Sequence, residues 1–426
     1  MFTNHGIDKA ISKFFKSSAK NAYSKIDPVF TDLFGGAERC EYLYETWYDE
    51  LDYDFAEQYF ESKKVKAPFG GCSSFRKNNF LCRNYDWYYN EGASFVVHTP
   101  AKNGYNATIG VAGNVPSLTD EFVQTKKYSD MYRLVPFMIV DGINDKSVSV
   151  STNVVPTGDK GVHAEIEAAV FPKHRVCSLA LPRFILDNFS SALEAVEYIR
   201  DYVTVYHPKS LLEAGYEQHY IIADSVQTKE STGATYILEF VTDENGKSVV
   251  EIITPASNNE HNYYEGIITN FHIDGVEFGA DMGVGTPVTD TERVQENYHI
   301  TPNGAGLERF NIIVYNWSNL GEKKEPYQAL LENLHFSNAY TITAAADKWY
   351  SEFVGHTYSS GLTLTVDSTP EEFGPFMADA AIAWTNRNRK SPKVWQTVHS
   401  SVYDMNEKVL YLSVQENFNH TYEFKL

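Results

Sequence analysis

The sequence has no long apolar run and no secretion signal. The apolar stretch at residues 134–140 is far shorter than the roughly 20 residues that a helix needs to cross a bilayer. Residues 1–20 intersperse lysines among apolar residues, without the continuous apolar core or the cleavage site of a signal peptide. We therefore expect no membrane insertion and a cytoplasmic location.

Basic residues and paired cysteines are also scarce. The chain has 36 Lys and Arg residues against 56 Asp and Glu residues, a formal net charge of -20, and no basic tract that would bind phosphate groups. Nucleic acid is therefore not expected as a partner. The four cysteines, Cys40, Cys72, Cys82 and Cys177, form no C-x-x-C pair and have no histidine nearby at ligand spacing. We expect neither a metal site nor a disulfide framework.

Aromatic residues and strand-like segments, by contrast, are abundant. The 29 Tyr and 26 Phe favour extensive sheet packing, although such side chains also line apolar or sugar-binding clefts. A turn at residues 77–79 separates two predicted strands, at 72–76 and 80–84. Further strands are predicted at residues 94–98, 107–112, 148–153, 219–223, 236–241 and 248–253, and strand-like alternation returns over residues 394–426.

Helices are predicted between these groups of strands. Ser191 and Glu194 have the spacing of a capping box at the start of a helix. The side chains expected on the buried face of that helix are Leu193, Val196, Ile199 and Val203. Two more helices are predicted, one after Pro326 and one at residues 370–386. Strands in runs, then helices, then strands again predict an α+β architecture with helices on sheet faces.

Residues 1–71 differ from the rest of the chain in composition and in hydrophobic pattern. Apolar residues within 7–19 fall on one helical face, and residues 38–64 are acidic and aromatic without strand alternation. We expect two or three helices here, which pack on one another or lie on a membrane surface. Residues 63–71 have the composition of a linker. The chain is therefore divided into a helical N-terminal segment, 1–71, and a larger domain, 72–426.

Cys72 opens the first predicted strand and is the candidate nucleophile. A cysteine that attacks an acyl group needs a base for its proton and donors for the oxyanion. The base is either a distant histidine or the cysteine's own α-amino group, whose pKa of about 7.7–8.0 suits a general base. The flexible Pro- and Gly-containing residues before Cys72 favour the second design. The common alternative is a buried structural cysteine.

The second strand of the hairpin carries charged groups. Arg83, Asn84 and Asp86 return to the side of Cys72 if the two strands pair. Arg83 would then favour the thiolate, and Asp86 would accept a hydrogen bond from the α-ammonium or from a substrate amide. An exposed Arg–Asp pair at a strand end, of little energetic value, is the alternative.

This segment resembles the start of the choloylglycine hydrolase family, which hydrolyses linear amide C–N bonds and includes bile salt hydrolases and penicillin V acylases. Its members begin the mature chain with Cys-(Thr/Ser) and continue, after a hairpin, with Gly-Arg-Asn-x-Asp. The chain has CS at Cys72 and CRNYD from Cys82, so a second thiol replaces the family's glycine. The resemblance implies a four-layer αββα sandwich of the N-terminal-nucleophile (Ntn) type, with no cofactor.

Three later passages resemble the family in the same order. DGIN and the strand after it nominate Asn153 as an oxyanion-hole side chain. EGIITN nominates Asn270 as a second polar ligand of the tetrahedral intermediate, although the proline expected soon afterwards is missing. LERF is the loosest match and nominates Arg309. The resemblance implies the catalytic set Cys72, Arg83, Asp86, Asn153, Asn270 and Arg309.

An Ntn enzyme requires a free amine on its nucleophile, so we predict cleavage of the Gly71–Cys72 bond by Cys72 itself. The released segment either stays bound as a subunit or covers the cleft until it is cut. The substrate implied by the resemblance is a small-molecule amide, such as a conjugated bile acid, penicillin V or an N-acyl amide. A homo-oligomer is compatible with the sequence.

Three other functions are open at this point. An acyltransferase would use the same Cys72 thioester and pass the acyl group to an amine instead of water. A non-catalytic carbohydrate- or ligand-binding protein would use its tyrosines and keep Cys72 as a structural residue. A protease of the Cys-His-Asn kind would take its base from a histidine elsewhere in the chain.

Overall fold

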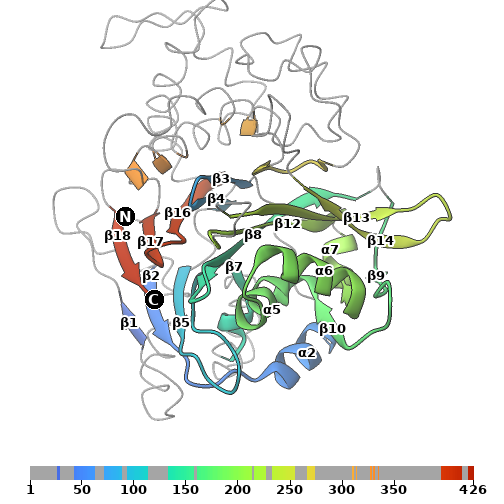
Figure 1. The fold of residues 1–426 in the computed structure, drawn as a ribbon, viewed down its shortest axis with the longest axis horizontal. Coiled ribbons are helices and arrows are strands. Elements are labelled where there is room, and N and C mark those ends of the chain that lie inside the picture. Colours follow the sequence, from blue (N-terminus) through green and yellow to red (C-terminus); the bar gives the residue numbers. More distant parts are fainter. Residues whose placement is uncertain are drawn as a thin grey trace, which may run out of the picture.

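The computed structural model describes residues 26–28, 43–62, 72–88, 94–113, 133–157, 161–213, 215–226, 233–254, 266–273, 395–414 and 421–426, together with the single residues 309, 310, 313, 327, 328, 330, 331 and 334. These residues contain two large sheets and one small sheet. Helices cover one face of the larger sheet (Figure 1).

The strands of the nine-stranded sheet are, in spatial order, β1 (Ile26–Pro28), β2 (Leu43–Trp47), β5 (Ser94–Thr99), β6 (Thr108–Ala112), β7 (Ile139–Asn144), β8 (Val148–Pro156), β12 (Tyr216–Asp224), β13 (Thr235–Thr242) and β14 (Ser248–Ile253). Those of the six-stranded sheet are β15 (Ile267–Ile268), β3 (Cys72–Lys77), β4 (Phe80–Tyr88), β16 (Trp395–Asp404), β17 (Val409–Val414) and β18 (Tyr422–Lys425). The small sheet contains β10 (His174–Cys177), β11 (Val203–Tyr206) and β9 (Glu165–Ile166).

The helices bounded in the structure are α2 (Tyr53–Ser62), α5 (Leu181–Asn188), α6 (Ala192–Tyr202) and α7 (Lys209–Glu213), with short 3-10 helices at Val135–Phe137 and Ser178–Ala180. In Figure 1, α5 and α6 lie on one face of the nine-stranded sheet, and β3, β4 and β16 lie on the other. The described residues therefore form three layers, and the predicted α+β architecture is confirmed. The fourth layer of the predicted αββα sandwich stays a prediction.

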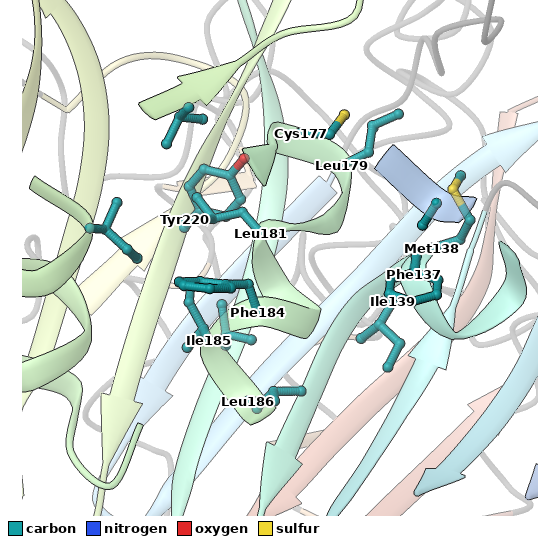
Figure 2. Packing of buried hydrophobic residues seen from close by; sticks show 14 of the residues in the cluster. Phe137, Met138, Ile139, Cys177, Leu179, Leu181, Phe184, Ile185, Leu186 and Tyr220 are labelled. Carbon is teal, nitrogen blue, oxygen red and sulfur yellow. The ribbon is translucent and has the colours of Figure 1, made fainter. Parts of the chain in front are cut away.

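Apolar side chains fill the layer between the helices and the nine-stranded sheet. Figure 2 shows Leu181, Phe184 and Ile185 of α5 gathered near Tyr220 of β12. All four belong to one buried cluster, and this burial supplies most of the free energy that holds an amphipathic helix on a sheet.

The capping box predicted for α6 is present. The hydroxyl of Ser191 accepts a hydrogen bond from the main-chain nitrogen of Glu194 at 3.2 Å. The predicted buried face is only partly correct. Val196 and Ile199 are buried, whereas Leu193 is 45% exposed because the buried stripe begins one residue earlier, at Ala192. Val203, also predicted on that face, lies in β11 after the helix ends.

The layer between the two large sheets is apolar in one part and polar in another. Leu81, Ile109 and Ile221 belong to its apolar part. The polar part contains buried side chains that both sheets direct inward, and they are Ser74, Arg83, Asp141, Ser151, Asn153, His219, Glu239 and His399. Buried polar groups are costly unless they are paired, so their positions mark where the fold is built for something other than stability alone.

The strands predicted from alternation are all present. The structure places β3 and β4 around the expected turn, where Asn78 has a positive φ of 54°, a conformation that asparagine tolerates well. The other predicted strands correspond to β5, β6, β8, β12, β13 and β14, and the predicted C-terminal strands to β16, β17 and β18. Residues 327, 328, 330, 331 and 334 are helical, in agreement with the helix expected after Pro326.

The expectation of an all-helical N-terminal segment is wrong for residues 43–47. They form β2, which pairs in parallel with β5 and antiparallel with β1. The strand has only five residues, with Glu45 and Trp47 partly exposed between buried neighbours, and so short an alternation does not stand out in the sequence. α2 agrees with the helical expectation.

Several predictions lie outside the described residues, namely the helices at 7–19 and 370–386 and the linker at 63–71. None of the described helices has the length and apolar character needed to cross a bilayer.

Candidate active site

Cys72 is the first residue of β3 and lies between two neighbouring segments. On one side it pairs with Tyr85 of β4. On the other side β15 pairs with Phe75 and Ser74, which brings the residues after β15 to the same end of the sheet. The side chain of Cys72 points toward the nine-stranded sheet, as the inward contacts of Ser74, two residues along, also show. Cys72 is only 4% exposed in the uncut chain.

Arg83 lies beside the sulfur, as predicted from the hairpin. Its Nη2 is 3.4 Å from Cys72 Sγ. Among the described residues it is the hydrogen-bond partner of that sulfur, and no histidine fills this place. A guanidinium stays protonated at any physiological pH, so it places a fixed positive charge beside the sulfur.

Arg83 is itself held from three directions. It donates a short hydrogen bond to the carbonyl of Val140, lies 3.6 Å from a carboxylate oxygen of Asp141, and is stacked over the ring of Tyr85 at 5.1 Å. Burial alone would lower the pKa of Arg83, but the neighbouring Cys72 and Asp141 outweigh it and the pKa is raised. The guanidinium is thus kept charged and in one position.

Asp141 anchors this arrangement and was not predicted as a site residue. It accepts hydrogen bonds from His399 Nε2 and Ser401 Oγ, both at 3.1 Å, and a short one from the hydroxyl of Tyr403. Burial alone would raise the pKa of Asp141, but His399 and Arg83 hold it below the usual range. Asp141 begins the DGIN passage, so the motif contained it, but only the packing of β7 against β16 across the two sheets reveals its partners.

Asn270 lies beside the nitrogen of Cys72. Its Oδ1 accepts a hydrogen bond from Cys72 N at 2.7 Å, and its Nδ2 donates to the carbonyl of Val154 at 2.7 Å. The nitrogen that would become the α-amine after cleavage is therefore already oriented by a side chain.

Arg309 and Asp86 lie on the other side of the strand. Arg309 donates to the carbonyl oxygen of Cys72 and, at 2.6 Å, to Oδ1 of Asn270. Asp86 accepts a hydrogen bond from Thr397, and its Oδ2 lies 3.7 Å from Nη1 of Arg309. The sequence expectation placed Asp86 next to the sulfur. Alternation along β4 instead directs Arg83 toward the sulfur and Asp86 toward Arg309.

Asn153 is within the same polar layer but makes different contacts. Its Oδ1 accepts a hydrogen bond from Ser74 Oγ at 3.0 Å. Its Nδ2 donates to the carbonyls of Ile268 and Thr269 at 3.2 and 3.1 Å. In this geometry Asn153 ties β8 to the segment that carries Asn270, and the oxyanion role expected for it stays a prediction.

Cys82, the departure from the family pattern, does not share the site. Its side chain is fully buried in the apolar cluster that includes Phe75 and Leu81. Burial raises the pKa of the Cys82 thiol well above its ordinary value, so it is a poor nucleophile. Within the described ranges, no three His, Cys, Asp or Glu side chains are grouped to hold a metal ion.

Comparison with known proteins gives likeness only among solved structures. No protein-family model matches the chain, and a search of curated proteins finds no match. Two variants of the conjugated bile acid hydrolase from Clostridium perfringens are similar, at 12% and 14% identity, each with a TM-score of 0.39. The alignments cover 84% and 83% of this chain and 92% of each hydrolase. Penicillin V acylase from Agrobacterium tumefaciens is similar at 13% identity with a TM-score of 0.36, over 81% of this chain and 82% of the acylase.

Proposed function

We propose that the chain is a hydrolase of linear amide C–N bonds that uses Cys72 as its nucleophile, after cleavage of the Gly71–Cys72 bond. One observation carries the proposal: both reactive atoms of this residue have a dedicated partner. Arg83 lies 3.4 Å from the sulfur, and Asn270 accepts a hydrogen bond from the nitrogen at 2.7 Å. A cysteine retained for packing needs neither contact.

In the first half of the reaction, Cys72 Sγ adds to the amide carbonyl carbon and its proton passes to the α-amine. Arg83 stabilises the developing thiolate. The oxyanion is bound by the second N–H of Asn270 Nδ2 and by main-chain N–H groups, each such donor contributing about 3 kcal/mol to the barrier reduction. For Asn153 to act as a donor too, one of its bonds to Ile268 or Thr269 has to open.

In the second half, the C–N bond breaks and the amine leaves with the proton held by the α-ammonium. A thioester remains on Cys72. Water then attacks the thioester while the α-amine takes a proton from it, and the acid and the free thiol are released. If an amine replaces water, the same intermediate gives acyl transfer, the alternative considered from the sequence.

Cleavage before Cys72 follows from the same chemistry. The sulfur attacks the carbonyl carbon of the preceding residue, the C–N bond breaks, and the acyl group moves to sulfur as the nitrogen becomes a free amine. Water hydrolyses this thioester and releases the N-terminal segment. Gly71 lies outside the described residues, so this step is proposed from the requirement for a free amine rather than from its geometry.

We further propose that the N-terminal segment stays bound as a subunit after cleavage. β2 lies inside the nine-stranded sheet between β1 and β5. Leu43, Thr46, Tyr48 and Phe60 are each at most 3% exposed. Loss of this segment would uncover the β5 edge and the apolar residues beneath α2.

Polar contacts join the same segment to the domain. Tyr53 donates a short hydrogen bond to Asp187, which also accepts from Arg183 at 2.9 Å. Arg175 forms an ion pair with Glu61 of α2. Departure of the segment would leave the buried Asp187 without one of its partners, a further cost.

The substrate classes proposed are those implied by the sequence resemblance: conjugated bile acids, penicillin V and N-acyl amides. The deciding experiment combines mass spectrometry of the purified protein with hydrolysis of a panel containing taurine and glycine conjugates, penicillin V and long-chain N-acyl amides. We expect a fragment that begins at Cys72 and release of free amine from at least one substrate. Cys72→Ala should stay full length and inactive.

Cys82→Ala is the matched control, because it removes a buried thiol one strand away, and it should be cut and active. An uncut wild-type chain with full activity would overturn the N-terminal amine mechanism. If a histidine variant instead abolished turnover without affecting cleavage, the Cys-His-Asn alternative would be correct. A wild-type protein that binds but never hydrolyses the panel would favour the ligand-binding alternative.

A further inference from the structure

Three neighbouring strands of the nine-stranded sheet carry a row of buried polar residues. Asn153 of β8 is the direct cross-strand partner of His219 of β12. The next strand, β13, carries Glu239. All three face residues 266–273, the segment that supplies Asn270. The reaction described above gives neither His219 nor Glu239 a role.

His219 bridges the row to that segment. Its Nδ1 lies 2.9 Å from Oε1 of Glu239, and its Nε2 lies 3.0 Å from the carbonyl oxygen of Thr269. Both partners are acceptors, so both ring nitrogens must carry a hydrogen for the two bonds to exist together. A ring that donates from both nitrogens therefore satisfies a carboxylate on one side and a carbonyl on the other, and the side chains of His219 and Glu239 are fully buried.

Glu239 holds a second point on the same segment. The oxygen that accepts from His219 also accepts from the main-chain nitrogen of Ile273 at 2.8 Å. His272 Nδ1 lies 3.6 Å from the other oxygen. Burial alone would raise the pKa of Glu239, but its contacts with His219 and His272 hold it well below the usual range. Glu239 is thus kept as the charged acceptor that both bonds require.

The two held points lie on either side of Asn270. Thr269 precedes it and is bound through its carbonyl by His219 and, at 3.1 Å, by Asn153. Ile273 follows it by three residues and is bound through its nitrogen by Glu239. We propose that Glu239 and His219 are positioning residues that clamp the segment carrying Asn270 and so hold its side-chain oxygen against the nitrogen of Cys72. The inference rests on the proposed function of that site.

A carboxylate and a doubly protonated imidazole are the pair that satisfies both ends of this clamp. In Glu239→Gln, the amide oxygen can face Ile273 and accept hydrogen bonds from its N–H and from His219 Nδ1. A neutral His219 ring that donates through Nδ1 then has a lone pair on Nε2, and this lone pair faces the carbonyl oxygen of Thr269 without bonding to it. If the amide flips, its N–H₂ satisfies His219 but faces the N–H of Ile273. One end of the segment is released in either orientation.

The test compares Glu239→Gln with Glu217→Gln. Glu217 is the matched control, because it forms another buried Glu–His pair from β12, and its bonds go to the nitrogen and Nδ1 of His163, both at 2.7 Å. We expect Glu239→Gln to lower kcat by about 10- to 100-fold, since displacements near 1 Å have effects of this size, while KM stays within about threefold. Glu217→Gln should lower stability without this loss of kcat per folded molecule.

Hydrogen–deuterium exchange of peptides covering residues 266–273 gives a readout that does not need activity. Exchange there should accelerate in Glu239→Gln and stay at the wild-type rate in Glu217→Gln. If Glu239→Gln fails to fold, His219→Gln, which loses one of the two donors, carries the same expectations. Unchanged exchange and kcat, or equal losses in both glutamate variants, would overturn the clamp. A wild-type protein inactive on every amide would refute the proposed function, whereas the exchange result judges the clamp by itself.

Discussion

The side-chain oxygen of Asn270 accepts a hydrogen bond from the main-chain nitrogen of Cys72 at 2.7 Å, although the two residues are 198 positions apart in sequence. Arg309 donates to the same oxygen at 2.6 Å. Two donors therefore converge on one acceptor before the chain is cut. The nitrogen that we propose as the base is oriented in the precursor, and cleavage does not have to build the site.

Asn270 variants separate the two functions of this side chain. Asp at this position keeps an oxygen for Cys72 and Arg309 but has no N–H to offer an oxyanion. We expect Asn270→Asp to lower kcat by about 10²- to 10³-fold, the usual effect of removing one oxyanion donor. Single-turnover acylation should slow by the same factor. A smaller loss in Asn153→Asp would agree with the bonds of Asn153 to main-chain carbonyls.

Arg83→Gln should make Cys72 a slower nucleophile at neutral pH. The neutral amide no longer places a positive charge beside the sulfur, so we expect iodoacetamide to label Cys72 more slowly at neutral pH. Arg83→Lys keeps the charge and should fall between the two. Peptide mass spectrometry distinguishes Cys72 from Cys82, which lies in the apolar cluster away from Arg83 and serves as an internal control. Identical labelling profiles in wild type and Arg83→Gln would contradict the assignment.

The N-terminal segment should be needed for a soluble enzyme. Residues 72–426 produced alone lack β2 and α2, and we expect them to aggregate because the β5 edge and the apolar surface under α2 are uncovered. Co-production of residues 1–71 as a separate polypeptide should restore a soluble complex that elutes as one species in gel filtration. A soluble, active 72–426 fragment would show that the segment is dispensable.

His207 predicts a slope of stability with pH. Burial lowers its pKa from 6.5 to about 4, so between these values the unfolded chain binds a proton that the native chain does not. The free energy of unfolding should therefore fall as pH drops through this window, by about 3 kcal/mol in total. The raised pKa of His272 adds no slope there, because its stabilisation is fully present below the unfolded value.

Chemical denaturation of the uncut Cys72→Ala chain at several pH values between 7 and 4 measures this slope. His207→Asn retains a side-chain N–H for the carbonyl of His163, which His207 contacts through Nδ1 at 2.8 Å. This variant should lose the slope. Equal slopes in the two proteins would assign the effect to other groups.

Local patterns predicted those elements whose partners are close in sequence. The β3–β4 hairpin follows from alternation on both sides of Asn78, and the start of α6 follows from Ser191 and Glu194. β2 was missed because it has only five residues and its partner, β5, lies beyond the hairpin. Strand pairing over such distances depends on tertiary structure more than on local propensity.

The sequence predicted the candidate site about as completely as it predicted the fold. Motif order nominated Cys72, Arg83, Asn270 and Arg309, and the structure brings them together. The motif order did not reveal that Asp86 faces Arg309, because the side to which a strand residue points depends on its register. His219 and Glu239 were not nominated, since each is an isolated residue within a strand and only the antiparallel pairing of β12 with β13 brings them together.

The parallel pairing of β2 with β5 also requires the chain to fold before it is cleaved. Before cleavage, the strand and its partner belong to one molecule, so their meeting is an intramolecular event whose rate does not depend on protein concentration. After cleavage, denatured material consists of two polypeptides that must find each other again. Recovery of the mature enzyme from denaturant should then fall on dilution, as in an obligate heterodimer, whereas recovery of the uncut chain should not.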